Sequence, residues 1–223
     1  MHQDRVILSE AALVELAWWE AALETARDYA VPLASRFTFP TATQHGVLTH
    51  YGDASREFDE VTRLAAESSG FGAWTIIEND FVFIEGRWTH DECAHYSINV
   101  LELHTEGMGA TTFVKYAKQR GVEVSHVLTF IDNTCAEFVA ERGRTHSEGI
   151  NQLNQRRHSV LLAEGISQMT ERVASIFNDV ADLLSRGDIK EALRHPREAG
   201  LKVIRLKVDA DVRQLDGVEP TWA

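Results

Sequence analysis

Four acidic side chains stand at places where a charge needs an explanation. Asp53 ends a predicted strand, Asp132 ends the most apolar predicted strand, and Asp182 falls in the first turns of a predicted helix. Glu102 lies one turn after Ile98 on a helical stripe that should face a sheet, where an apolar side chain is expected. If the elements pack as their periodicity indicates, the four carboxylates converge.

A converging set of acids predicts a divalent-metal site. Buried carboxylates repel one another and lose their hydration, so cations must share the site, and hard oxygen ligands favour Mg²⁺ or Mn²⁺. Two such ions about 3.5–4 Å apart activate a water and stabilise the leaving oxygen of a phosphodiester displacement. The set therefore predicts a nuclease. Taken singly, each acid has the alternative of a helix cap or a solvated charge, since the chain contains 34 acidic residues.

Hydrophobic periodicity predicts the elements that position these acids. The predicted strands are residues 46–53, 71–77, 81–88, 127–131 and 172–176, and the predicted helices are residues 9–28, 97–120, 133–142, 147–164 and 178–186. The second and third strands form a hairpin, so three antiparallel strands precede an alternation of helices and strands. The predicted fold class is α/β: a mixed five-stranded sheet, three antiparallel strands and then parallel strands, flanked by helices, with an N-terminal helix and a C-terminal tail. Ligands should gather at the carboxyl ends of the parallel strands.

Composition limits the function classes. The 223 residues include 22 Lys and Arg against 34 Asp and Glu, a net charge of −12, which argues against binding nucleic acid through bulk positive charge. A local basic groove remains compatible with this balance. No apolar run approaches the ~20 residues that span a bilayer, and the first residues lack a signal-peptide pattern, so we expect a soluble intracellular protein without membrane contact.

The segments that carry the four acids resemble the ribonuclease H (RNase H) domain that follows reverse transcriptase in retroelements, and most closely that of DIRS-type, tyrosine-recombinase retrotransposons. The segments are Asp53-Ala54-Ser55 with Gly70-Phe71-Gly72-Ala73-Trp74, then Ile98-Asn99-Val100-Leu101-Glu102-Leu103, then Phe130-Ile131-Asp132-Asn133-Thr134, and finally Asn178-Asp179-Val180-Ala181-Asp182-Leu183-Leu184-Ser185-Arg186. The likeness covers residues 10 to 187. Leu16-Ala17-Trp18-Trp19 also resembles the connection segment that precedes this domain.

The resemblance implies an RNase H-like fold and a set of roles. Asp53, Glu102, Asp132 and Asp182 would ligate two Mg²⁺ or Mn²⁺ ions and hydrolyse the RNA strand of an RNA–DNA hybrid. It also implies three parts: a connection-like helical segment at residues 1–45, an RNase H-like domain at residues 46–190, and a basic tail or arm at residues 191–223. The acidic insert at residues 56–69 departs from the family pattern, and residues 165–177 lack the histidine that many members carry there.

Basic and polar residues near these motifs are candidates for contact with nucleic acid. The predicted contacts are Ser55, Asn133, Lys115, Lys118, Arg156 and Arg157. The alternative for the basic residues is a solvated helix face, which the net charge favours. The tail after Gly200, with Lys202, Arg205 and Lys207 between apolar residues, is predicted either as a basic arm or as an edge strand.

Two other functions stay open at this point. One is a catalytically idle, retroelement-derived domain that serves as a structural subunit of a nucleic-acid complex and docks a protein partner through its N-terminal helix or its tail. The other is a related DNA-cutting enzyme such as a resolvase or an integrase core. The substrate, whether hybrid, double-stranded RNA or DNA, is not decided by the sequence.

Overall fold

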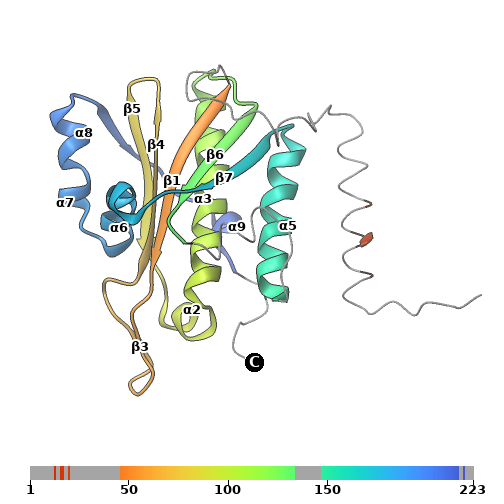
Figure 1. The fold of residues 1–223 in the computed structure, drawn as a ribbon, viewed down its shortest axis with the longest axis vertical. Helices are drawn as coiled ribbons and strands as arrows, with labels where there is room; N and C mark the ends of the chain where they lie inside the picture. The colour runs from red at the N-terminus through yellow and green to blue at the C-terminus, as the bar shows by residue number, and fades with distance from the viewer. Residues whose placement is uncertain are drawn as a thin grey trace, which may run out of the picture.

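A six-stranded sheet with helices on both faces forms the body of the molecule (Figure 1). The computed structural model describes residues 46–133, 147–215 and 218, together with residues 13, 16, 17 and 20. The strands are β1 (Val47–Ser55), β2 (Phe58–Asp59), β3 (Leu64–Ala65), β4 (Gly70–Ile77), β5 (Asp80–Arg87), β6 (His126–Ile131), β7 (Ser167–Arg172) and β8 (Lys202–Arg205). The helices are α2 (His90–His95), α3 (Ile98–Gln119), α5 (Glu148–Ala163), the 3₁₀ turn η2 (Ser175–Phe177), α6 (Asp179–Arg186), α7 (Ile189–Ala192), α8 (Arg194–Glu198) and α9 (Ala210–Arg213).

The strand order of the main sheet is β7-β6-β1-β4-β5-β8. β1, β4 and β5 form an antiparallel meander, whereas β6 joins β1 in parallel and β7 joins β6 in parallel. The predicted fold class is confirmed. The sheet has one strand more than the predicted five, because the tail contributes β8, which pairs in parallel with the free edge of β5. The edge-strand interpretation of the tail is thus the correct one of the two.

Two segments differ from the sequence prediction in detail. The strand predicted at residues 172–176 lies earlier, at Ser167–Arg172, and residues 175–177 form a 3₁₀ turn instead. The reason is the end of α5: Gly165 adopts a positive φ of 69°, which turns the chain directly into the register His126↔Ser167 beside β6. The acidic insert at residues 56–69 contains the small hairpin β2–β3.

Some predictions fall on parts of the chain outside the described residues. These are the helix at residues 134–142, the residues Trp18 and Trp19, and most of the N-terminal segment. The four described residues of the predicted N-terminal helix, Leu13, Leu16, Ala17 and Glu20, are helical and exposed.

The core lies between the sheet and α3, and α3 packs along β1 and β4. Its inward side chains include Val100, Leu101, Met108 and Phe113, none of which is measurably exposed. Helices α6, α7 and α8 cover the opposite face, where Leu184 packs against Phe81 and Phe83 (Figure 1). Within the described ranges, none of the helices combines the length and the apolar character needed to cross a bilayer.

Candidate metal centre

Asp53, Glu102 and Asp132 meet at one end of the sheet, where β1 and β6 finish. Each offers a carboxylate oxygen, and these three oxygen atoms all lie within 4.8 Å of one another. The parallel pairing of β1 with β6 places Tyr51 opposite Phe130, and the same offset places Asp132 beside Asp53. Glu102 reaches the pair from the second turn of α3. The tertiary structure therefore brings together three of the four predicted acids at the carboxyl ends of two parallel strands.

Asp53 is held in place by a hydrogen bond from α6. Its carboxylate Oδ2 accepts from the Ser185 hydroxyl at 2.6 Å, and its side chain is 7% exposed. Burial raises the pKa of Asp53 to about 7; the Ser185 hydrogen bond opposes this shift, and the charges of Asp132 and Asp182 add to it. The hydrogen bond therefore orients the carboxylate, but it does not offset the cost of keeping a negative charge buried.

The close approach of α6 depends on glycine in β4. A Cβ atom added at Gly72 would lie 2.4 Å from the Leu184 Cβ and 2.6 Å from the Ser185 backbone nitrogen, so any side chain there would push α6 away from the sheet. Gly72 and Ser185 both lie in the motifs named above, but nothing in those motifs indicates that the glycine allows the serine to reach Asp53. Their separation of more than a hundred residues left no local signal for this contact.

Glu102 contains the clearest sign of a missing partner. Its Oε2 atom is buried and, among the residues that the structure describes, no group donates a hydrogen bond to it. Burial raises the pKa of Glu102 to about 9, and the neighbouring charge of Asp53 raises it further, whereas a hydrogen bond from Asn133 lowers it. An unpartnered carboxylate oxygen among other carboxylates fits a divalent cation, because hard oxygen donors are the ligands that Mg²⁺ and Mn²⁺ prefer.

Asp182 lies near this group but not within it. Its charge raises the pKa of Asp53, which shows that the two side chains are neighbours. Its own Oδ1 accepts a hydrogen bond from Arg186 Nε at 2.8 Å, and its side chain is 44% exposed. In this arrangement Arg186 neutralises Asp182, so the role of Asp182 as a fourth metal ligand remains a prediction.

Of the predicted nucleic-acid contacts, Asn133 and Ser55 lie close to the acids. The Asn133 side-chain nitrogen donates to Asn99 Oδ1 at 2.9 Å beside Glu102. Ser55 is buried, where its hydroxyl donates to the Ser185 carbonyl at 3.0 Å and accepts from the Gly70 amide at 3.1 Å. Ser55 therefore ties β1 to α6 and β4, and its hydroxyl faces protein rather than solvent.

The predicted basic contacts on the helices are mostly neutralised. Lys115 pairs with Asp209 at 2.6 Å, Lys118 pairs with Glu164, and Arg156 is exposed on α5. Arg157 points into the protein instead of toward a phosphate: its Nη1 donates to Glu106 Oε2 at 2.9 Å, and the two side chains are 3% and 1% exposed. The sequence suggested a helix face for Arg157 but gave no indication that its partner would be buried on α3.

Comparisons with known proteins found only solved structures of low similarity to report. No family model matches the chain, and no curated protein matches it. Among solved structures, the chain is similar to RNase H1 from the halophilic archaeon Halobacterium salinarum NRC-1, with 14% identity, a TM-score of 0.39 and coverage of 66% of this chain and 99% of that one. It is also similar to the N-terminal RNase H domain of Rv2228c from Mycobacterium tuberculosis, with 16% identity, a TM-score of 0.40 and coverage of 69% and 99%.

A third similar structure is LC11-RNase H1, isolated from compost by a metagenomic approach, with 12% identity, a TM-score of 0.42 and coverage of 66% and 99%. The chain has an RNase H-like α/β fold. The strand order and strand directions given above define this fold, whereas the similarity scores are too low to add an argument about function.

Proposed function

We propose that this protein is a divalent-metal-dependent, RNase H-like endonuclease that hydrolyses the RNA strand of RNA–DNA hybrids. The observation that carries the proposal is the meeting of Asp53, Glu102 and Asp132 within 4.8 Å, with one Glu102 oxygen buried and without a donor among the described residues. The choice of a hybrid as substrate, and an origin in a DIRS-type retroelement, rest on the sequence resemblance alone and are part of the proposal.

The chain's own residues have distinct tasks in this proposal. Asp53, Glu102 and Asp132 hold Mg²⁺ or Mn²⁺, and Asp182 is the proposed fourth ligand. Ser185 fixes the orientation of the Asp53 carboxylate by its hydrogen bond to Oδ2. Two bound ions would neutralise the carboxylates, lower the pKa of an attacking water and stabilise the leaving oxygen.

The test is cleavage of a labelled RNA–DNA hybrid in Mg²⁺ or Mn²⁺ at several salt concentrations. We expect Asp132→Asn to lower the rate by at least about 100-fold, because it removes a ligand charge from the metal centre. The matched control is Asp91→Asn, the same chemical change at an exposed position in the first turn of α2. Circular dichroism and thermal unfolding should show both variants folded.

Two results would overturn the proposal: no cleavage by the wild-type chain with either ion, or equal rates for Asp132→Asn and Asp91→Asn. Parallel reactions with double-stranded RNA and double-stranded DNA decide the substrate. Preferential cutting of DNA would replace the hybrid with the substrate of a resolvase-like or integrase-like enzyme.

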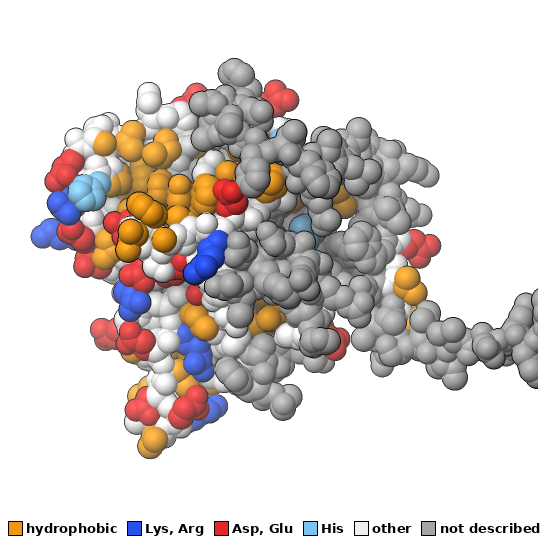
Figure 2. Space-filling model, in the orientation of Figure 1, with side chains coloured by type: hydrophobic (Ala, Val, Ile, Leu, Met, Phe, Trp, Pro, Cys, Tyr) orange, Lys and Arg blue, Asp and Glu red, His pale blue; other side chains and the backbone are white. Residues whose placement is uncertain are grey.

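A catalytically idle assembly subunit is the second candidate. The observation in its favour is that Lys115, Lys118 and Arg157, three of the predicted nucleic-acid contacts, each pair with a carboxylate of the chain. Figure 2 shows acidic and basic side chains interspersed over the described part of one face rather than a continuous basic field. Purification with one fixed protein partner and without metal would favour this candidate.

A further inference from the structure

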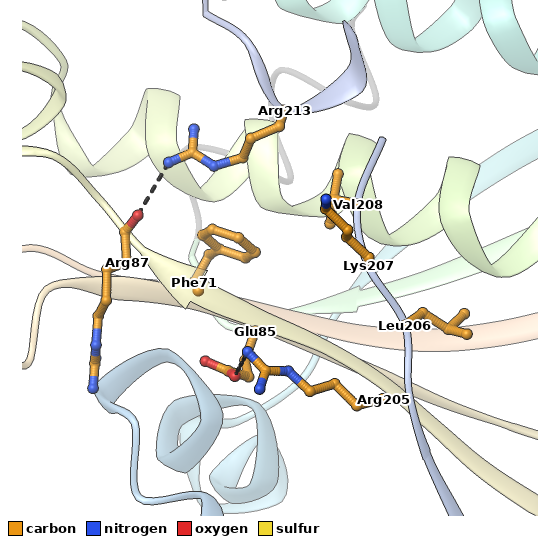
Figure 3. Close-up of a pocket in the computed structure, with 9 residues that line it drawn as sticks. Phe71, Glu85, Arg87, Arg205, Leu206, Lys207, Val208 and Arg213 are labelled. Carbon is orange, nitrogen blue, oxygen red and sulfur yellow. Dashed lines mark hydrogen bonds and ion pairs between the residues drawn. The ribbon is translucent and has the colours of Figure 1, made fainter. Parts of the chain in front are cut away.

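A basic cavity opens where β8 separates from β5. The two strands pair as far as Phe83↔Arg205, and the Leu206 amide still donates to the Phe83 carbonyl at 2.8 Å. Beyond this point the tail diverges from Glu85, Gly86 and Arg87, and a cavity of about 480 Å³ lies between them (Figure 3). Four cationic residues line this cavity, namely Arg87, Arg205, Lys207 and Arg213. Arg87 presents its backbone carbonyl to Arg213, whereas its side chain points toward α6 (Figure 3).

Two of these cations are compensated and two are not. Arg205 pairs with Glu85, and Arg213 pairs with Glu92. Arg87 donates to the Ser185 carbonyl at 3.4 Å, and Lys207 is exposed; within the described part of the chain, neither has a carboxylate at ion-pair distance. Within the described residues, a chain with a net charge of −12 thus keeps Lys207 beside this cavity without a carboxylate partner.

The guanidinium of Arg213 is oriented by aromatic rings. It lies 5.2 Å from the centroid of Phe71 and 4.7 Å from that of Trp88, and its Nη2 donates to the Arg87 carbonyl at 3.1 Å. Stacking of this kind holds the planar group in one orientation, which favours recognition of phosphate oxygens. Because Arg213 covers the ring of Phe71, that ring is not presented for stacking with a base.

One residue connects this cavity with the metal centre. Ser185 donates its hydroxyl to Asp53 Oδ2 at 2.6 Å, and its carbonyl accepts from Arg87 Nη1 at 3.4 Å. β5 runs in the same direction as β1, because each is antiparallel to β4. Both strands therefore finish at the same end of the sheet. Asp53 and Glu85 lie level with one another, since both pair with Gly72 of β4. The cavity and the carboxylates therefore lie at the same end of the sheet, with β4 between β1 and β5.

We infer that this cavity binds the phosphodiester backbone of the nucleic acid whose cleaved phosphate lies at the metal centre. The inference rests on the proposed function and deepens it. Arginine and lysine side chains are the usual partners of backbone phosphates, and the volume is within the ~300–1,000 Å³ typical of ligand sites. Because the polar lining consists of charged groups and the cavity presents no open ring, the contact is independent of base sequence.

The test measures hybrid binding separately from cleavage. The titrations use the full chain in an Asp132→Asn background without divalent metal, with a fluorescein-labelled RNA–DNA hybrid and anisotropy as the signal. Lys207→Gln removes an uncompensated charge of the cavity without touching Ser185 or the acids. Lys202→Gln is the matched control, since Lys202 begins β8, is exposed like Lys207 and does not line the cavity.

We expect Lys207→Gln to raise the Kd by about 3–10-fold and to reduce the slope of log K against log salt by about 1, because one phosphate contact is lost. Arg205→Gln combined with Lys207→Gln should weaken binding further. Lys202→Gln should leave both quantities unchanged. Equal Kd and slope for Lys207→Gln and Lys202→Gln would overturn the inference, as would failure of the background variant to bind the hybrid at all.

The two proposals fail in different ways. If the wild-type chain does not cleave but Lys207→Gln weakens hybrid binding, the nuclease proposal is wrong and the cavity assignment stands. If the wild-type chain cleaves and Lys207→Gln binds like the control, only the cavity assignment is wrong. Titration with inorganic phosphate and adenosine monophosphate completes the design: an effect of Lys207→Gln on these small anions, without an effect on the hybrid, would replace the backbone site with a small-anion site.

Discussion

Two glutamates one turn apart on α3 have opposite surroundings. Glu106 is fully buried and accepts a hydrogen bond from Arg157 at 2.9 Å, and Arg157 in turn donates to Asn154 at 2.7 Å. Glu102 faces Asp53 and Asp132, and its Oε2 has no donor among the described groups. Glu106 also has one buried oxygen, Oε1, without a donor among the described groups. The difference is that the fold supplies a cation for Glu106 from within the chain, whereas Glu102 has the Asn133 amide and further acids beside it.

The pKa directions express the same difference. Burial raises the pKa of Glu106 to about 7, and both the charge and the hydrogen bond of Arg157 oppose that rise. Burial raises the pKa of Glu102 to about 9, and the charges of Asp53, Asp132 and Glu106 act in the same direction. A buried acid therefore has a structural role when the fold itself supplies the opposite charge. It is a candidate metal ligand when the opposite charge must come from solution.

The largest effect is expected from removing the cation that pairs with Glu106. Arg157→Met leaves Glu106 buried without its cation, and we expect the free energy of unfolding to fall by about 3–5 kcal/mol. Equilibrium urea unfolding measures this loss. The double variant Glu106→Leu with Arg157→Met should recover most of it, since neither charge then remains buried. A loss below about 1 kcal/mol for the single variant would show that the pair does not have this role.

A smaller effect on the free energy of unfolding is expected from metal binding at Glu102, which has no cation from within the described chain beside it. Mg²⁺ at a concentration 100 times its Kd should stabilise the wild-type chain by about 2.7 kcal/mol, because the ion binds the folded site and not the unfolded chain. Thermal unfolding with Mg²⁺ and with chelator measures the shift in Tm. Glu102→Gln should abolish the shift, whereas Glu123→Gln, the same change at an exposed position, should preserve it. Equal shifts in both variants would mean that the ion binds elsewhere.

The last expected effect is a change in the free energy of unfolding with pH, which distinguishes acids that lack a cation from the paired Glu106. The folded pKa of Asp53 is about 7 and that of Glu102 about 9, above the ordinary values of 3.8 and 4.5, so the folded state binds more protons than the unfolded state between these limits. Without metal, these two acids should therefore lower the free energy of unfolding as the pH rises. The net fall should appear from about 7 to about 9, because the lowered pKa values of the buried His50, His104 and His158 act in the opposite direction below their ordinary value of 6.5. Urea titrations across this range measure the slope. Saturating Mg²⁺ should flatten it, and a slope unaffected by Mg²⁺ would contradict the assignment.

Local chemistry made much of the fold predictable. The hairpin of β4 and β5, the long helix α3 and the stop of α6 at Gly187, where φ is 82°, follow from periodicity and from residues that favour turns. The position of β7 was wrong by about one strand length, because its bounds are set by pairing with β6 rather than by its own residues. The sequence of the tail was compatible with a basic arm or an edge strand. The structure shows a strand, because residues 202–205 pair with the free edge of β5.

The amino-acid sequence by itself determined that Asp53 and Asp132 stand near the ends of strands and that Glu102 stands on the apolar stripe of a helix. This is why the three could be named before their distances were known. Only the tertiary structure decided two of the partners: Ser185 with Asp53, and Arg157 with Glu106. The physical reason is range. Helix and strand periodicity is encoded in neighbouring residues, whereas the pairing of a buried charge depends on packing between elements that lie far apart in the chain.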